Sequence, residues 1–214
     1  MSDDIYMERG KSQVLFNYLP NNTFDYTGEK GIHKVVKVET IPHTESNQSY
    51  IIEQVKNRVS AWKRGSGYGA VGYPNFEEDY QLVRPREVKT TLFPLLFECT
   101  SCDQIHTYDD TDELDRYNRN LDCKNCNGNI QQRQLVFLHE CGEIKTPQPY
   151  QCNQCGSWDD WELETYGSQR FRNTEWSCDN CGNTKDFQAR CDCDLESRNM
   201  TPYVHRASSA FQPQ

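Results

Sequence analysis

The cysteines are confined to one part of the chain, and their distribution limits the fold more than any other feature. All eleven lie between Cys99 and Cys193 of the 214 residues, and most of them form pairs separated by only one or two residues. An odd number of cysteines is awkward for a disulfide framework, whereas close pairs are typical of metal sites. We therefore expect reduced thiolates that bind metal ions.

The first two pairs have the layout of a zinc ribbon. Cys99 and Cys102 form one C-x-x-C pair, and Cys123 and Cys126 form another after an interval of twenty residues. In a zinc ribbon, two such knuckles each present two thiolates to one tetrahedral ion. Redox-active vicinal thiols, as in thioredoxin, are the alternative, but they do not explain two matched pairs outside a βαβ pattern.

The remaining cysteines and one histidine are enough for two more zinc sites, if neighbouring pairs combine. The first would comprise His139, Cys141, Cys152 and Cys155. The second would comprise Cys178, Cys181, Cys191 and Cys193. The eleven cysteines and His139 then fill three tetrahedral shells, so the expected cofactor is three zinc ions. Sequential pairing is an assumption, and an interleaved cross-brace stays open.

Two of these ligands have a plain alternative. A lone histidine is more often structural than a ligand, although His139 lies two residues from Cys141 in a site that is otherwise one ligand short. The spacing of Cys191 and Cys193 is tighter than that of a usual knuckle, so one of them could be spare. Glycine directly follows several knuckle cysteines, at Gly142, Gly156 and Gly182, where a backbone that curls around a metal needs a positive φ.

The expected shells are closed, which argues against catalysis. A catalytic zinc keeps one position open for water. Glu140 directly follows His139, so the segment lacks the H-x-E spacing of the zinc deaminases. The acidic run at 109–113 is interpreted as a solvated loop, and no nucleophile with an adjacent base is evident. We expect no enzyme activity.

The composition changes near residue 90, and this predicts an α+β fold in three parts. Residues 1–90 lack cysteine and are expected to form a small N-terminal α/β region with a basic, aromatic and glycine-rich loop. Residues 91–196 are expected to form a cluster of three zinc-ribbon-like modules with short antiparallel hairpins. Residues 197–214 are expected to form a strand-like C-terminal tail whose alternating apolar positions run from Val204 to Pro213, with no evident mate.

Periodicity places the expected elements. Apolar residues at helical spacing predict one helix, which Ser46 or Ser49 could cap and Gly65 could end. They are Ile51, Val55, Val59 and Trp62. In the first part, strands are expected at 14–19 and 32–38. In the cysteine-rich part, short strands are expected at 91–93, 95–97, 134–138, 161–164 and 174–176.

Charge and compartment follow from the composition. Only 35% of the residues are hydrophobic, and metal sites can replace part of the missing apolar burial. The net charge of −9 excludes a generally basic nucleic-acid binder, so any such contact needs a local patch. The acidic N-terminus lacks a following apolar run, and no stretch approaches the length of a membrane span. We therefore expect a cytoplasmic protein without membrane contact.

Residues 54–76 contain four cations, no acid and several aromatic rings, a pattern that suits single-stranded nucleic acid. With two arginines further along, the candidate nucleic-acid-binding residues are Lys56, Arg58, Lys63, Arg64, Tyr68, Arg84 and Arg86. The alternative is that the cations form the solvated face of the helix and the rings its core, which the place of Trp62 in the apolar stripe slightly favours. The match of residues 67–72 to G-x-G-x-x-G lacks the flanking strand and helix of a dinucleotide site.

Five segments, in order along the chain, resemble the N-terminal part of the DrmB family of the prokaryotic antiphage system DISARM. They are 10–15 (GKSQVL), 93–102 (FPLLFECTSC), 136–142 (VFLHECG), 176–182 (WSCDNCG) and 205–213 (HRASSAFQP). The resemblance implies a non-catalytic zinc-binding partner of a DISARM helicase that helps the helicase to engage DNA. Members of that family are longer, which would make this chain a split, truncated or minimal member. The alternative is a free-standing zinc-ribbon module that binds RNA or protein in transcription or translation.

Overall fold

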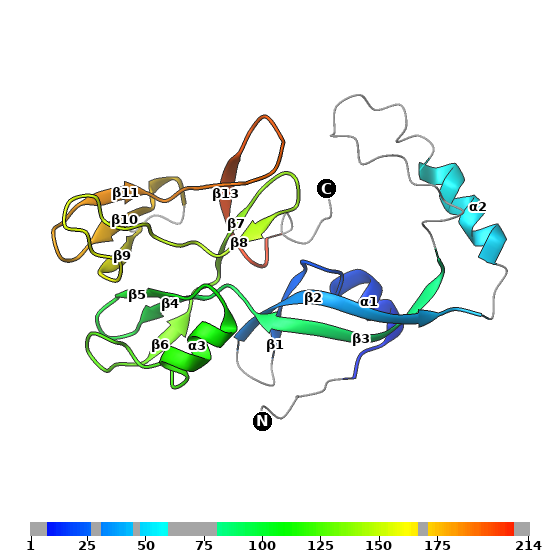
Figure 1. Ribbon diagram of the computed structural model, residues 1–214, viewed down its shortest axis with the longest axis horizontal. Helices are drawn as coiled ribbons and strands as arrows, with labels where there is room; N and C mark the ends of the chain where they lie inside the picture. The colour runs from blue at the N-terminus through cyan, green and yellow to red at the C-terminus, as the bar shows by residue number, and fades with distance from the viewer. Residues whose placement is uncertain (1–7, 27–30, 45–47, 60–80, 167–170, 208–214) are drawn as a thin grey trace.

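The computed structural model describes residues 8–26, 31–44, 48–59, 81–166 and 171–207. Within these residues the chain is mixed α+β, with few helices and many short antiparallel strands, as expected. The strands form four small sheets, and Figure 1 shows them side by side. Their strand orders are β1-β2-β3, β5-β4-β6, β12-β13-β7-β8 and β11-β10-β9.

The N-terminal sheet is dominated by a long two-stranded ribbon. Its strands are β1 (Thr23–Tyr26), β2 (Gly31–Pro42) and β3 (Val83–Leu92). The strand expected at 32–38 is therefore confirmed, with a longer extent. Register shifts interrupt the pairing of β2 with β3 between Val35 and Lys37 and between Glu39 and Thr40. In Figure 1 this ribbon projects away from the cysteine-rich sheets, and α2 lies beyond its far end.

The strand expected at 14–19 is wrong, because this segment begins in the helix α1 (Lys11–Asn17). The Gly10 N–H donates to the Gln13 side chain, which satisfies a donor at the start of the helix. Of its apolar residues only Val14 is buried, whereas Leu15 and Phe16 are exposed. A short apolar run does not distinguish a strand from a helix by periodicity.

The helix α2 (Gln48–Val59) matches the predicted helix in position. In its apolar stripe, Val55 is 40% exposed, so this position is not part of a core. Ser49 lies within the helix rather than before it. Ser46, Trp62 and Gly65 lie outside the described residues, as does the glycine-rich segment.

The first cysteine-rich sheet is joined by a short helix. Its strands are β4 (Leu96–Cys99), β5 (Ile105–Thr107) and β6 (Ile130–Gln132), and the helix is α3 (Thr111–Asn118). The acidic run interpreted as a loop in fact begins this helix. The Asp110 side chain accepts a hydrogen bond from the Glu113 N–H, and acidic residues in the first turn complement the helix dipole.

The two remaining sheets are nested along the chain. One contains β7 (Leu135–Leu138), β8 (Ile144–Lys145), β12 (Ala189–Arg190) and β13 (Asn199–Val204). The other contains β9 (Trp161–Glu164), β10 (Glu175–Cys178) and β11 (Thr184–Asp186), with the 3₁₀ turn Phe171–Asn173 before β10. The β9–β11 sheet is thus an insertion between β8 and β12. The short strands expected beside the cysteine pairs are confirmed here.

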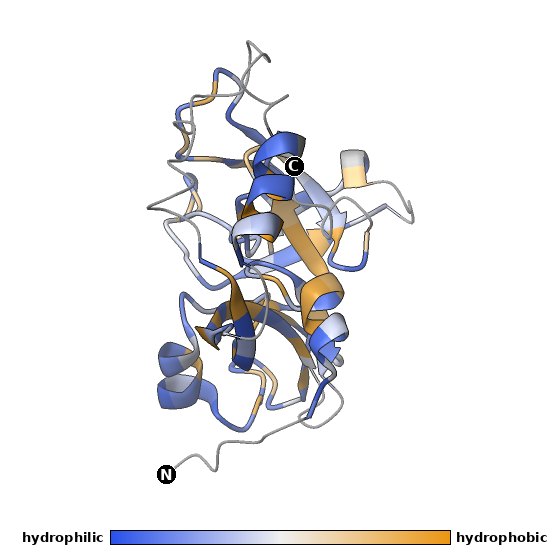
Figure 2. Cartoon of the chain, turned by 90° about the vertical axis from the view of Figure 1, so that its right-hand side faces the viewer, coloured by the Kyte–Doolittle hydropathy of each residue, from blue (hydrophilic) through white to orange (hydrophobic). Residues whose placement is uncertain are grey.

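The main core lies between the nested sheets. Trp161, Trp176 and Phe137 are fully or almost fully buried there. The Phe187 ring packs tilted against Phe137 and edge-on against Trp176, with centroids 4.8 and 5.1 Å away. Buried cysteines belong to the same core, so the metal sites and the apolar packing are continuous. Figure 2 shows apolar colouring concentrated on the strands and hydrophilic colouring over loops and much of the helical surface.

The C-terminal segment has a mate within the chain, which corrects the expectation of an unpaired strand. A strand at Asn199–Val204 lies within the expected tail of residues 197–214, and it pairs with both β7 and β12. Residues beyond Ala207 lie outside the described part. After β13, the His205 carbonyl accepts from the Thr23 hydroxyl, and Arg206 pairs with Asp25 at 2.7 Å, which ties this segment to the N-terminal sheet.

The first cysteine-rich sheet also contacts the N-terminal sheet directly. The Ile32 N–H donates to Gln132 Oε1 at 2.7 Å, and Gln132 Nε2 donates to the Pro94 carbonyl at 2.8 Å.

No helix within the described ranges is long and apolar enough to cross a membrane.

Candidate metal centres

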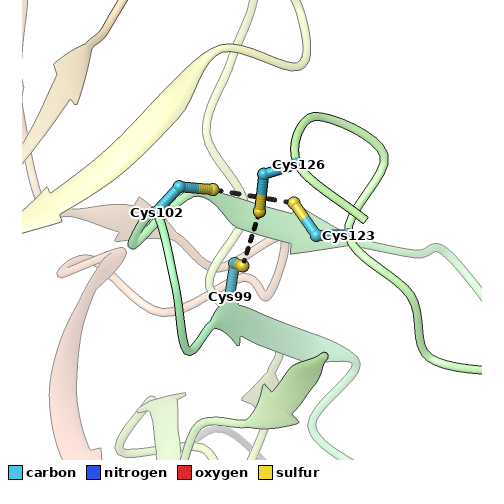
Figure 3. Close-up of side chains that lie close together, drawn as sticks. All are labelled: Cys99, Cys102, Cys123 and Cys126. Carbon is cyan, nitrogen blue, oxygen red and sulfur yellow. Dashed lines mark hydrogen bonds between the residues drawn. The ribbon is translucent and has the colours of Figure 1, made fainter. Parts of the chain in front are cut away.

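The first candidate centre is the cluster of Cys99, Cys102, Cys123 and Cys126, as predicted. The four thiols converge from two knuckles, one after β4 and one before β6 (Figure 3). The Sγ atoms of Cys99 and Cys126 lie 3.5 Å apart, and those of Cys102 and Cys123 lie 3.7 Å apart. Zn–S bonds of about 2.3 Å in a tetrahedron place sulfurs roughly 3.8 Å apart, so the spacing fits zinc.

The knuckle backbones explain how these side chains reach one another. Asp103 and Asn127 adopt positive φ values of 58° and 56°, which lets the chain curl back directly after each pair. A Cβ atom on Gly128 would lie 2.8 Å from Ser101 Oγ and 3.2 Å from Cys126 Sγ. Gly128 is therefore required for the close approach of the two knuckles.

The thiols of this cluster cannot all ionise without a compensating cation. Burial raises the pKa of Cys99, but the Ser101 and Cys102 N–H groups and neighbouring thiols outweigh it and lower that pKa to about 7. The Gln104 N–H lowers the pKa of Cys102, whereas burial and the other thiols raise it to about 12. A divalent ion would supply the missing positive charge, because cysteines bind zinc as deprotonated thiolates.

The second candidate centre comprises His139, Cys141, Cys191 and Cys193. The Sγ atoms of Cys141 and Cys191 lie 3.6 Å apart, and His139 Nδ1 lies 3.5 Å from Cys193 Sγ. His139 and Cys141 lie in the turn between β7 and β8, where Gly142 has a φ of 88°. Both cysteines of the tight pair take part, so neither is spare.

The orientation of His139 supports its role as a ligand. Its ring is buried, and Nε2 lies 2.8 Å from the Ser197 carbonyl oxygen, to which the Nε2–H donates. Metal-binding histidines typically donate their second ring N–H to such an acceptor, which fixes the tautomer. The arrangement leaves the Nδ1 lone pair facing the cysteines.

The third candidate centre comprises Cys152, Cys155, Cys178 and Cys181. The Cys152–Cys181 and Cys155–Cys178 sulfur pairs are each 3.6 Å apart. The Cys155 N–H helps to lower the pKa of Cys152 to about 6, whereas burial and the Cys155 thiol raise the pKa of Cys178 to about 12. As in the first cluster, a bound cation would balance the four thiolates. In each of the three clusters, all ligand atoms lie within 4.8 Å of one another, so the chain can hold three zinc ions.

The expected sequential pairing of the second and third sites is wrong. In the structure, the first and last pairs of this region form one site, with ligands at 139, 141, 191 and 193. The two middle pairs form the other site, with ligands at 152, 155, 178 and 181. The physical reason is the insertion of the β9–β11 sheet, which carries the complete third site between β8 and β12. The arrangement is not an interleaved cross-brace either, because one ligand set lies wholly inside the other.

His106 is a residue of the site that the sequence analysis missed. It lies on β5, and its Nε2 is 3.3 Å from Cys123 Sγ. Burial and the Lys124 charge lower its pKa, so the neutral ring is favoured, and an Nε2–H tautomer can donate to the thiolate. The only sequence signal was a histidine on a short strand after a knuckle.

The predicted nucleic-acid-binding residues are divided between two described elements and a part outside them. Lys56 and Arg58 lie on α2, and Arg84 and Arg86 lie on β3. Arg86 is exposed, whereas Arg84 is partly buried and its Nε donates to His43 Nδ1 at 2.6 Å. Lys63, Arg64 and Tyr68 lie outside the described residues.

The comparison with known families covers almost the whole chain. A family model described as "Domain of unknown function (DUF8724)" matches residues 10–212. This span includes the N-terminal ribbon, all three clusters and β13. No curated protein matches the chain. Because this match covers most of the chain, the chain belongs to the DUF8724 family.

Proposed function

We propose that this protein is a non-catalytic, zinc-stabilised subunit that assists a partner helicase in engaging DNA during antiphage defence. The observation that carries the proposal is the completeness of the three clusters. Each brings together four thiol or imidazole ligands, which fill a tetrahedral shell, whereas a catalytic zinc keeps a position for water or substrate. The ions would therefore hold the modules in shape, and the function would lie in the surfaces that they support.

A basic ribbon supports the DNA-binding part of the proposal. β2 and β3 together carry five lysines and arginines but only two carboxylates, in a chain with a net charge of −9. A two-stranded β-ribbon can enter the major groove, and its cations can contact phosphates. Lys37 and Lys89 both pair with Glu39, at 2.9 and 3.4 Å. Arg84 and Arg86 lie near the start of β3, where the exposed Arg86 is a candidate for a phosphate contact.

The resemblance to the DISARM component supports the choice of a helicase as partner. Three of the five resembling segments contain ligands of the candidate zinc centres, at 93–102, 136–142 and 176–182. A scaffold held by metal, with a basic projection, suits a protein that acts through an enzyme partner.

Salt-dependent DNA binding tests this function. The full zinc-loaded chain is titrated onto a labelled single-stranded oligonucleotide and onto the matching duplex, by fluorescence anisotropy at several salt concentrations. Arg84→Glu with Arg86→Glu should weaken binding and lower the salt slope by about one per lost phosphate contact. Lys63→Glu with Arg64→Glu tests the adjoining basic segment in the same way.

The matched control reverses two exposed charges elsewhere, Arg116→Glu with Arg119→Glu at α3. It should leave the slope unchanged apart from a small effect of net charge. Equal slopes in the control and both test variants would contradict DNA binding by this surface. Co-expression with a helicase encoded beside the gene tests the partnership, and separate elution of the two proteins in size-exclusion chromatography would contradict it.

A further inference from the structure

The outer face of the β9–β11 sheet carries a row of carboxylates. In the sheet register, Glu175 lies directly opposite Glu164 on one side and Asp186 on the other. Residues that are directly opposite in an antiparallel sheet share a face, and like charges in such positions destabilise the sheet. The opposite face is apolar, with Trp161 and Trp176 in the core. The row therefore carries an unfavourable charge arrangement on an otherwise well-packed sheet.

None of the cations that the structure describes forms an ion pair with this row. Lys185 on β11 is turned to the other face, where Nζ donates to the Gln151 carbonyl at 2.6 Å and lies 5.5 Å from the Trp161 ring. Among the described side chains, the row receives hydrogen bonds from two neutral donors, the Tyr166 hydroxyl to Glu175 and the Gln188 amide to Asp186. The described cations thus leave its negative charge unbalanced, and a cationic ligand would balance it.

A cavity of about 650 Å³ adjoins two of these carboxylates. Its lining includes the acidic residues Glu175 and Asp186 and the aromatic residues Phe171 and Phe187. The lining also includes Thr174, which is only 5% exposed and whose hydroxyl has no hydrogen-bond partner. A buried hydroxyl without a partner is costly, and a polar group from a ligand would satisfy it. Charge, apolar walls and an unsatisfied acceptor therefore meet in one cavity.

This combination suits a guanidinium group. Its planar fork donates several hydrogen bonds to carboxylates, and its face stacks on aromatic rings. A hydrated divalent cation would instead seek six or more oxygen ligands, and two carboxylates and a hydroxyl beside two phenylalanines do not supply them. A nucleic acid would be repelled by the carboxylate row.

The edge of the sheet indicates how the arginine is presented. β11 pairs only with β10 and forms one edge of its sheet, and Asp186 ends that edge at the cavity. An exposed edge can accept an extended segment through main-chain hydrogen bonds. We propose that this acidic-aromatic cavity binds an arginine side chain from an extended segment of a protein partner.

The site goes beyond the proposed DNA-binding role and is remote in sequence from the basic ribbon. It depends on the partner being a protein but not on that partner being a helicase. Its failure would leave the zinc content and the salt dependence of DNA binding unchanged, so the two proposals can be contradicted separately.

The test uses two capped, labelled peptides. The first has arginine at alternate positions of a threonine-valine sequence, and the second has citrulline at the same positions. Citrulline keeps the size of arginine and removes its charge. In fluorescence anisotropy with the full zinc-loaded chain, the arginine peptide should bind at least about tenfold more tightly. Glu175→Gln with Asp186→Asn should abolish this preference without lowering the melting temperature, because the variant also relieves like-charge repulsion.

The matched control removes two exposed carboxylates of α3, with Asp112→Asn and Asp115→Asn, and should retain the preference. Thr174→Val should weaken the arginine peptide more than the citrulline peptide. Equal binding of the two peptides, or an unchanged preference in the Glu175 and Asp186 double variant, would overturn the proposal. Release of the arginine peptide by Mg²⁺ at constant ionic strength would indicate a divalent-cation site instead and would also overturn it.

Discussion

The Sγ atoms of Cys141 and Cys191 lie 3.6 Å apart, although fifty positions separate the two residues in the sequence. Between them the chain completes another four-cysteine cluster on an inserted sheet. The ligands of the outer site therefore lie on both sides of the inner module in the sequence, and the buried cysteines of both sites pack into one core. The second and third zinc centres thus share one folded core and are not independent modules.

Zinc content in paired variants distinguishes nested from sequential sites. Cys141→Ser with Cys191→Ser removes two ligands of one cluster and should cost one zinc ion per chain. Cys141→Ser with Cys152→Ser removes one ligand from each of two clusters and should cost two ions after dialysis against a chelator, because each of these sites then keeps only three of its four protein ligands. Elemental analysis under reducing conditions gives the result. Sequential pairing predicts the reverse, and parent protein with one zinc ion or none would contradict the centres themselves.

The identity of the ligands could be predicted from the sequence, whereas their pairing could not. A two-residue interval such as that between Cys99 and Cys102 creates a knuckle by local geometry alone, so these ligands can be identified from the sequence. The distance between knuckles does not show which loop is an insertion. The partnership of His139 with Cys193 depends on β12 and β13 returning to β7, a long-range pairing without a local signal.

The N-terminal helix and His106 escaped prediction for related reasons. The apolar run around Val14 is too short for its period to decide between helix and strand. His106 acquires its place beside Cys123 only when β5 pairs with β4, which no spacing rule anticipates. Likewise, the carboxylate row of Glu164, Glu175 and Asp186 exists only in the register of three strands.

His139 should be replaceable by another ligand but not by an inert side chain. After dialysis against a chelator, His139→Ala should have lost one zinc ion, because the second cluster then has three protein ligands and only water to complete its shell. His139→Cys should retain all three ions, since a thiolate can complete the same shell. Elemental analysis of both variants, with the parent as control, gives the answer. Three ions in His139→Ala, with the same resistance to the chelator as the parent, would show that the histidine is structural.

His106 should strengthen zinc binding in the first cluster without being a ligand. His106→Phe removes the hydrogen bond to Cys123 and should weaken that site about tenfold to a hundredfold, as is typical of outer-shell partners. Competition with a chelator measures the affinity, and the cobalt–thiolate absorption of the Co²⁺-substituted protein should shift. His106→Gln keeps an N–H donor and should retain most of the affinity. Parent-like chelation in His106→Phe would contradict this role.

His205 should make the fold less stable in mild acid. Its ring is fully buried, neither ring nitrogen has a hydrogen-bond partner, and burial lowers its pKa below the ordinary 6.5 despite Asp25 nearby. The unfolded chain therefore binds a proton that the folded chain excludes, so stability falls as the pH drops below 6.5. His205→Leu should lose less stability between about pH 7.5 and about pH 5.5, because it loses no hydrogen bond and cannot titrate. Thermal unfolding of the variant and the parent at both pH values measures the difference, and zinc loss affects both proteins alike because their ligands are the same. Parallel losses of melting temperature in the two proteins would show that His205 does not contribute.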